Sequence, residues 1–118
     1  MAKPLFEQVA RGARDIIADR RRRLRGVEAV DVEGTECDPC DARAVRFCAV
    51  GALIKSAYLV TGDWERSHIL GWRVAGMIER ANGIVTEDDD GYGLVKLSDS
   101  RGGMAVLRAL DVFLTSKD

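Results

Sequence analysis

Apolar residues recur along the chain at the spacing of α-helices. The first such stretch runs from Pro4 to about Arg25, and its apolar residues cover roughly 140° of a helical wheel. They are Leu5, Phe6, Val9, Ala13, Ile16, Ile17 and Leu24. Pro4 suits the first position of a helix, and Gly26 suits the left-handed residue that ends one. The pattern therefore predicts an amphipathic helix over residues 4–25.

A second stretch is apolar around the whole wheel rather than on one face. Asp38 can accept hydrogen bonds from the first amides of a helix and Pro39 fits the next position, so we expect this helix to run from there to about Val60. A helix that is apolar on all sides is covered by its neighbours. This helix should therefore form the centre of the core, with Gly51 allowing another helix to approach closely.

The rest of the chain predicts two more helices and little regular β-structure. Asp63 can cap a helix over residues 64–81, and Ser98, Asp99 or Ser100 can cap a last helix. Residues 30–33 alternate as a short strand or extended connection would, and residues 84–97 form either a loop or a short hairpin. We expect one all-α or mostly α domain over residues 1–118, with four principal helices around a central buried helix and with or without one short β-hairpin.

Composition is typical of a soluble, folded chain. Hydrophobic residues make up 47% and charged residues 31% of the sequence. No apolar run reaches the roughly 18–20 residues that would span a membrane, and no signal peptide is recognisable at the N-terminus. The three cysteines are an odd number, which favours reduced thiols. We expect a cytoplasmic protein without a membrane partner.

Positive charge is concentrated near the N-terminus, where residues 1–26 carry eight Lys or Arg and three acidic residues. On a continuous helix, five arginines would fall within roughly 100° of arc, a stripe able to follow phosphates. They are Arg11, Arg14, Arg21, Arg22 and Arg25. Asp15 and Asp19 can instead pair with these arginines, and arginines near a helix C-terminus are favourable without a ligand. The stripe is a candidate surface for a nucleic acid or another partner.

Cys37 and Cys40 form the sharpest local pattern, a C-x-x-C at the expected start of a helix, which is a candidate thiol pair. Acidic neighbours should raise the pKa of these thiols, so a structural role is favoured over redox chemistry. Cys37, Cys40, Cys48 and His68 are an acceptable zinc ligand set, but they lack the paired spacing of zinc motifs. The acidic run at residues 88–91 fails as a calcium loop because Leu97 stands where a glutamate is required. We expect no cofactor and no metal.

The sequence contains few of the residues that common catalytic motifs require. It has one histidine, no G-x-S-x-G, no H-E-x-x-H and no phosphate-binding glycine loop; Gly102-Gly103 alone is a weak sign of an anion site. The leading hypothesis is a small non-enzymatic interaction module that binds a protein partner, which includes a second copy of itself. The alternative is a nucleic-acid-associated protein that uses the first helix, and an enzyme is the third option.

Residues 44–53, AVRFCAVGAL, resemble the signature A-V-R-W-C-x-x-G-A-L of an uncharacterised bacterial and phage family, a domain of unknown function. Leu97-Ser98-Asp99 is similar to the L-N-D step that precedes the last helix in that family. The resemblance implies a bacterial or phage setting and a helical fold. It implies no activity, and the signature residues would belong to a packed central helix.

Overall fold

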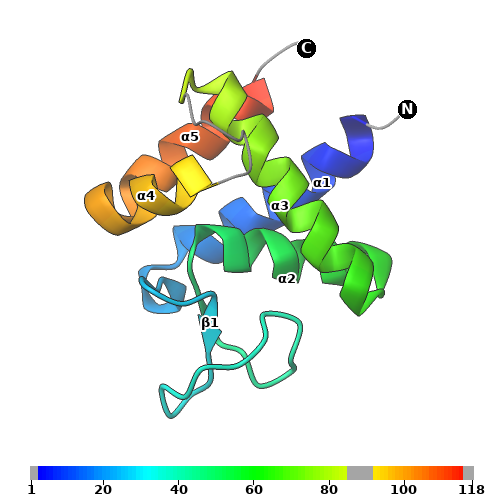
Figure 1. The fold of residues 1–118 in the computed structure, drawn as a ribbon, viewed down its shortest axis with the longest axis vertical. Coiled ribbons are helices and arrows are strands. Elements are labelled where there is room, and N and C mark those ends of the chain that lie inside the picture. The colour runs from blue at the N-terminus through cyan, green and yellow to red at the C-terminus, as the bar shows by residue number, and fades with distance from the viewer. Residues whose placement is uncertain (1–2, 85–91, 116–118) are drawn as a thin grey trace.

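The computed structural model describes residues 3–84 and 92–115, which form five α-helices and one two-stranded antiparallel sheet (Figure 1). The helices are α1 (Lys3–Ala18), α2 (Ala49–Thr61), α3 (Trp64–Ala81), α4 (Tyr92–Arg101) and α5 (Gly103–Thr115). A 3₁₀ turn, η1 (Arg20–Arg22), follows α1, and the strands are β1 (Ala29–Val30) and β2 (Arg46–Phe47). The predicted mostly α fold with a short β-element is confirmed.

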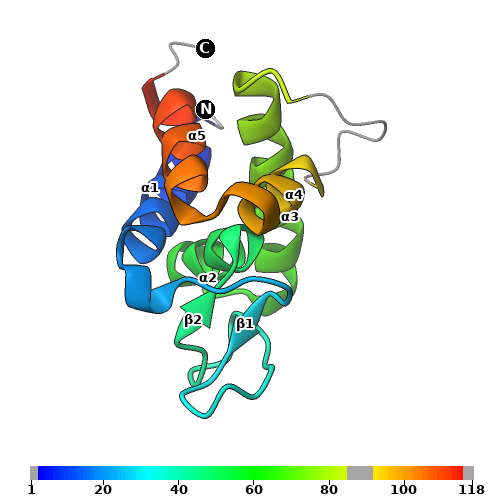
Figure 2. The same cartoon turned by 90° about the vertical axis from the view of Figure 1, so that its left-hand side faces the viewer.

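Helix α2 is the centre of the core, as its apolar pattern predicts. It lies between α1 and α3 (Figures 1 and 2), and α4 also packs against it. Its buried residues are Ala49, Val50, Gly51, Ala52, Leu53, Ile54, Ser56 and Ala57. The radius of gyration is 12.8 Å, close to the ~13.5 Å expected for one domain of this length.

The start of the central helix differs from the prediction, because α2 begins at Ala49 and residues 39–48 are not α-helical. Asp38 makes the expected local bond, accepting the amide of Cys40 at 2.8 Å. The chain then turns and enters β2, where Phe47 pairs with Ala29 of β1. Cys48 is the N-cap residue of α2, and its Sγ accepts the amide of Gly51 at 3.3 Å. Pairing with a distant strand thus overrides the local start signal.

The first helix is shorter than predicted, since α1 ends at Ala18 instead of continuing to Arg25. Asp19 has an extended backbone, and its side chain accepts the amide of Arg21 at 3.0 Å, which caps η1. The chain then runs beside β2, where the amide of Leu24 donates to the carbonyl of Phe47 at 3.0 Å. Residues 19–25 therefore leave the axis of α1 and lie against β2.

Helix α4 occupies part of the segment predicted as a loop or hairpin. Residues 92–97 are helical, and residues 85–91, which include the acidic run, lie outside the described residues. Glu79 of α3 is fully buried and accepts the amide of Leu94 at 2.8 Å, which satisfies one amide of the first turn of α4. Residues 98–100 lie inside α4 instead of capping the last helix. Gly102, at φ +82°, separates α4 from α5.

Glycines mark two close approaches around α2. A Cβ on Gly51 would lie 1.9 Å from the carbonyl oxygen of Glu28, so the neighbour at Gly51 is the chain just before β1 and not the predicted second helix. A Cβ on Gly71 would lie 2.6 Å from Cγ1 of Ile54, which is where α3 approaches α2. Among the described helices, none combines the length and the apolar character needed to cross a membrane.

Candidate functional site

Three arginines line a pocket of about 360 Å³ between η1, β2 and the start of α5. They are Arg20, Arg23 and Arg25, and Gly103 completes the polar side. Ile17, Phe47 and Val106 supply apolar lining. The pocket forms because η1 and the following residues turn away from α1 and lie beside β2, which brings this run of arginines to the first turn of α5.

The guanidinium groups in this pocket lie directly against the N-terminus of α5. The Arg23 side chain is fixed by its Nε, which donates to the carbonyl of Ile17 at 2.7 Å. A Cβ on Gly103 would lie 2.5 Å from that same Nε, and a Cβ on Gly102 would lie 2.7 Å from Nη2 of Arg25. The first amides of a helix lack intrahelical acceptors and form the positive end of its dipole. The positive guanidinium groups of Arg23 and Arg25 therefore lie against the positive end of the α5 dipole.

The other charged groups do not neutralise the pocket. Arg14 pairs with Asp111 of α5, and Arg21 pairs with Asp19. Among the side chains that the structure describes, those of residues 4–84, 93–97 and 101–115, no carboxylate lies within ion-pair distance of Arg20, Arg23 or Arg25. The described carboxylates therefore form no ion pair with these three arginines.

A second hollow lies on the other side of η1. It has a volume of about 450 Å³ and is lined by Arg21, Arg22 and Arg46, together with Asp19 and apolar residues. Arg22 also lies over the Phe47 ring, with Cζ 5.6 Å from the ring centroid. Residues of η1 thus line both hollows: Arg20 lines the first, and Arg21 and Arg22 line the second. We call the six residues Arg20, Arg21, Arg22, Arg23, Arg25 and Arg46 the arginine strip.

The predicted five-residue stripe is not one helix face. Arg11 is exposed and Arg14 half-buried on α1, whereas Arg21, Arg22 and Arg25 follow the end of that helix. The predicted stripe did not include Arg20, Arg23 or Arg46. The run of four arginines at residues 20–23 was the available signal for two of these, but a wheel that continues α1 to Arg25 turns Arg20 and Arg23 away from the others.

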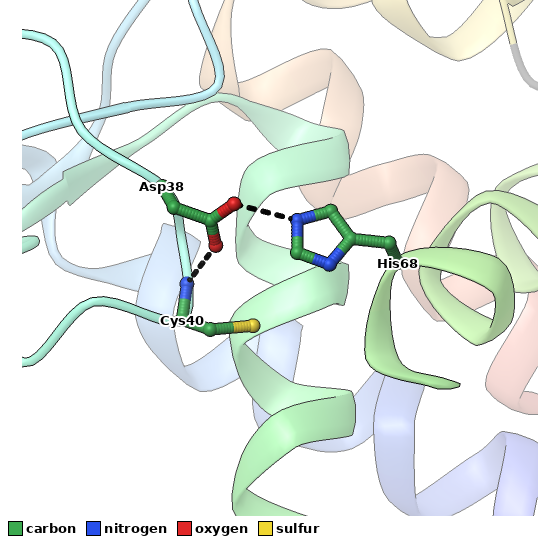
Figure 3. A group of neighbouring side chains, drawn as sticks. All are labelled: Asp38, Cys40 and His68. Atoms are coloured by element: carbon green, nitrogen blue, oxygen red, sulfur yellow. Dashed lines mark hydrogen bonds and ion pairs between the residues drawn. The ribbon is translucent and has the colours of Figure 1, made fainter. Parts of the chain in front are cut away.

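A second group of polar side chains joins the loop before β2 to α3. The ligand atoms of Asp38, Cys40 and His68 all lie within 4.8 Å of one another (Figure 3). Oδ2 of Asp38 is 2.8 Å from Nε2 of His68, and Oδ1 accepts the amide of Cys40. Nδ1 of His68 is 2.8 Å from the carbonyl oxygen of Trp64. We call these three residues the Asp-Cys-His cluster.

The cluster contains two residues of the zinc ligand set that the sequence analysis weighed and did not favour, Cys40 and His68, with Asp38 in place of the other two cysteines. Cys37 is half-buried and outside the cluster, and Cys48 caps α2. Sequence reasoning treated Asp38 as a helix cap and so missed it. The available sequence signal was that Asp38 stands two residues before Cys40. At that spacing its carboxylate accepts the Cys40 amide and so lies close to the Cys40 side chain.

The electrostatics do not favour the candidate thiol pair as a redox nucleophile. Burial, and then the charge of Asp38, raises the pKa of the Cys40 thiol to about 11. Burial and nearby Asp41 also raise the pKa of the Cys37 thiol. The pair does not stand at a helix N-terminus, which was the expected source of a lowered thiol pKa.

The surroundings of His68 are negative. Burial lowers the pKa of its imidazole, but the hydrogen bond to the Trp64 carbonyl and the charge of Asp38 outweigh that effect, so the pKa lies above its ordinary value. Burial raises the pKa of half-buried Glu28; the charge of His68 opposes this effect, and Asp38 and Glu36 add to it. Asp38 and Glu28 therefore both act on the His68 imidazole, and Glu36 acts on Glu28.

Comparison with protein-family models, with curated proteins and with solved structures finds no match to this chain. The resemblance of residues 44–53 to the uncharacterised bacterial and phage family stays a prediction. In the structure these residues form β2, the cap of α2 and its first turns. The residues of this chain alone therefore support the functional proposal.

Proposed function

We propose that the protein is a non-enzymatic binding domain that holds the phosphate backbone of a nucleic acid on the arginine strip. The observation that carries the proposal is the pocket in which Arg20, Arg23 and Arg25 lie at the N-terminus of α5 and pair with none of the carboxylates whose side chains the structure describes. The proposal includes a cytoplasmic location, where a nucleic acid is accessible.

Phosphate matches the chemistry of the pocket. A guanidinium group donates two parallel hydrogen bonds to phosphate oxygens and stays charged at any physiological pH. Helix N-terminal amides add donors to the same oxygens, and the helix dipole favours negative charge there. Arg23 is already held by the carbonyl of Ile17, so less of its side-chain freedom is lost on binding.

The length of the arginine strip favours a polymer over a single phosphate. Arg20, Arg23 and Arg25 line one hollow, and Arg21, Arg22 and Arg46 line the hollow across η1. A nucleic acid presents phosphates at regular intervals and so can contact both hollows at once. The formal net charge of the chain is −1, so the attraction must come from this local surface and not from the whole protein.

The test is the binding of fluorescently labelled single-stranded and duplex oligonucleotides, measured by anisotropy over a series of salt concentrations. We expect affinity to fall with salt and the triple variant R20Q/R23Q/R25Q to bind at least ten-fold more weakly. Each lost phosphate contact should reduce the slope of log K against log salt by about 0.7–0.9. The matched control R66Q/R101Q/R108Q removes three exposed arginines from outside the strip and should retain binding.

Two results would overturn the proposal. One is the absence of salt-dependent binding to every DNA and RNA tested; the other is equal weakening in the two triple variants. Circular dichroism of each variant establishes that it is folded before binding is compared. The prediction of a protein partner, or of a second copy as partner, stays a prediction and has no surface assigned to it.

A further inference from the structure

We propose that the Asp-Cys-His cluster binds a divalent transition metal of the zinc class. Asp38, Cys40 and His68 bring a carboxylate oxygen, a thiol sulfur and an imidazole nitrogen within 4.8 Å of one another. Zinc takes these three donor types in proteins, at about 2.0–2.3 Å and in tetrahedral geometry. Three protein ligands leave the fourth position to a water molecule. This site is separate from the arginine strip, and neither proposal depends on the other.

His68 already has the orientation that a metal-binding imidazole needs. A carbonyl oxygen only accepts, so the 2.8 Å contact between Nδ1 and the Trp64 carbonyl places a proton on Nδ1. Nε2 then faces the carboxylate of Asp38, as Figure 3 shows. An outer carbonyl that fixes the ring and its tautomer in this way is the usual second partner of a histidine ligand.

The loop holds the other two ligands. Oδ1 of Asp38 accepts the amide of Cys40 at 2.8 Å, which fixes the carboxylate and leaves Oδ2 toward His68. The same bond ties Asp38 to Cys40, whose side chain is buried beside the imidazole (Figure 3). Carboxylates at Glu28 and Glu36 add negative charge nearby. The cluster therefore suits a cation and has little freedom to lose when one binds.

Metal binding here is a ligand exchange without redox change. The metal takes the position between Oδ2 of Asp38 and Nε2 of His68, and the proton shared there leaves to solvent. The thiol of Cys40 loses its proton to solvent in the same way and binds as thiolate. The bound metal would connect the loop between β1 and β2 to α3, and so fix a loop that extends away from the helices next to the sheet (Figure 2).

The test is titration of the full chain with Co²⁺ under reducing conditions, followed by absorption and by the Tm. We expect one Co²⁺ per chain, a sulfur-to-cobalt charge-transfer band and a higher Tm. Loss of a group that only hydrogen-bonds a metal ligand typically weakens metal binding by roughly 10–100-fold. Asp38→Asn, Cys40→Ser and His68→Gln each remove a ligand itself, so each should weaken Co²⁺ binding by more than this. Asp38→Asn keeps an oxygen that can accept the Cys40 amide, so the loop should keep its shape.

Cys37→Ser is the matched control, because Cys37 lies three residues from Cys40 and outside the cluster. It should keep the charge-transfer band and the affinity. The proposal fails if the unaltered chain binds no stoichiometric Co²⁺, if Cys40→Ser retains the band, or if Cys37→Ser loses as much affinity as Cys40→Ser. Cooperative unfolding of each metal-free variant shows that any loss belongs to the site and not to the fold.

Discussion

At Gly51 a single hydrogen atom allows α2 to pack under the chain that precedes β1. A Cβ there would lie 1.9 Å from the carbonyl oxygen and 2.8 Å from the carbonyl carbon of Glu28. That carbonyl also accepts the amide of Cys48 at 3.1 Å, so it cannot move without disturbing the N-cap of α2. Backbone packing thus requires glycine at this position, although glycine is a weaker helix former than alanine.

Gly51→Ala should lower the free energy of unfolding. Alanine gains about 1 kcal/mol of helix propensity over glycine, but overpacking against backbone costs typically 1–3 kcal/mol and more where nothing yields. We therefore expect a net loss of about 1–2 kcal/mol in urea unfolding, near the upper end of that range because the Glu28 carbonyl is held by the Cys48 amide. Gly12→Ala is an informative comparison, because its Cβ would meet the Oγ of Ser56 at 2.1 Å, and Ser56→Ala should relieve that clash. Unchanged or higher stability in Gly51→Ala would contradict this account.

Single residues also show how far the sequence could predict the sites. Cys40 and His68 are residue types that bind zinc, so the sequence alone placed them in a candidate ligand set, although no metal was expected. Asp38 was not, because an aspartate before proline carries the same local signal whether it caps a helix or fixes a loop. The arginine run was evident, but which arginines share a surface depends on where α1 ends.

Helices were predictable wherever local signals decide their bounds. Asp63 caps α3 by accepting the amide of Arg66 at 3.0 Å, and α3 covers the predicted residues 64–81. The start of α2 and the presence of α4 were not predictable, because distant groups decide them. Phe47 pairs with Ala29, and Leu94 donates to Glu79 across fifteen residues. Neither partner can be identified from hydrophobic periodicity.

Helices α1 and α5 are joined by an ion pair between Arg14 and Asp111, in which Nη2 of Arg14 and Oδ2 of Asp111 are 3.3 Å apart. The hydrogen bond from Arg14 is the main cause that lowers the pKa of the Asp111 carboxyl. A carboxyl whose pKa is lower in the folded state stabilises the fold above its unfolded pKa of about 3.9 and loses that effect as the pH falls.

Asp111→Asn should therefore reduce stability slightly at neutral pH and not at all in acid. Both side chains are partly exposed, at 39% and 49%, so solvent screens the pair and the effect is small. Urea midpoints of Asp111→Asn and the unaltered protein should differ above about pH 5 and converge as the pH falls below about 4. In Arg14→Gln the same substitution should have no effect. A difference that persists at low pH would show that Asp111 acts by some other contact.

At the scale of the whole molecule, the arginine strip and the pocket beside it exist only because three distant parts of the chain meet. Residues 20–25 follow α1, Arg46 belongs to β2, and Gly103 begins α5. Each part is fixed by its own contacts, so the folded chain holds Arg46 and the N-terminus of α5 beside the arginines of residues 20–25, and unfolding separates them from these arginines. The fold therefore carries an unfavourable electrostatic term that an anion would relieve.

Because a bound anion would relieve this repulsion only in the folded chain, we predict that a nucleic acid stabilises the fold. A ligand that binds the folded state alone raises stability by RT ln(1 + [L]/Kd), about 2.7 kcal/mol at one hundred times Kd. For a domain of this size we expect the Tm to rise on the order of 10 °C with a single-stranded oligonucleotide at that concentration. Potassium chloride of equal ionic strength is the control for general screening. R20Q/R23Q/R25Q, which should bind at least ten-fold more weakly, should show at most about half of this rise with the oligonucleotide. An equal rise in that triple variant would mean that the stabilising anion binds elsewhere on the molecule.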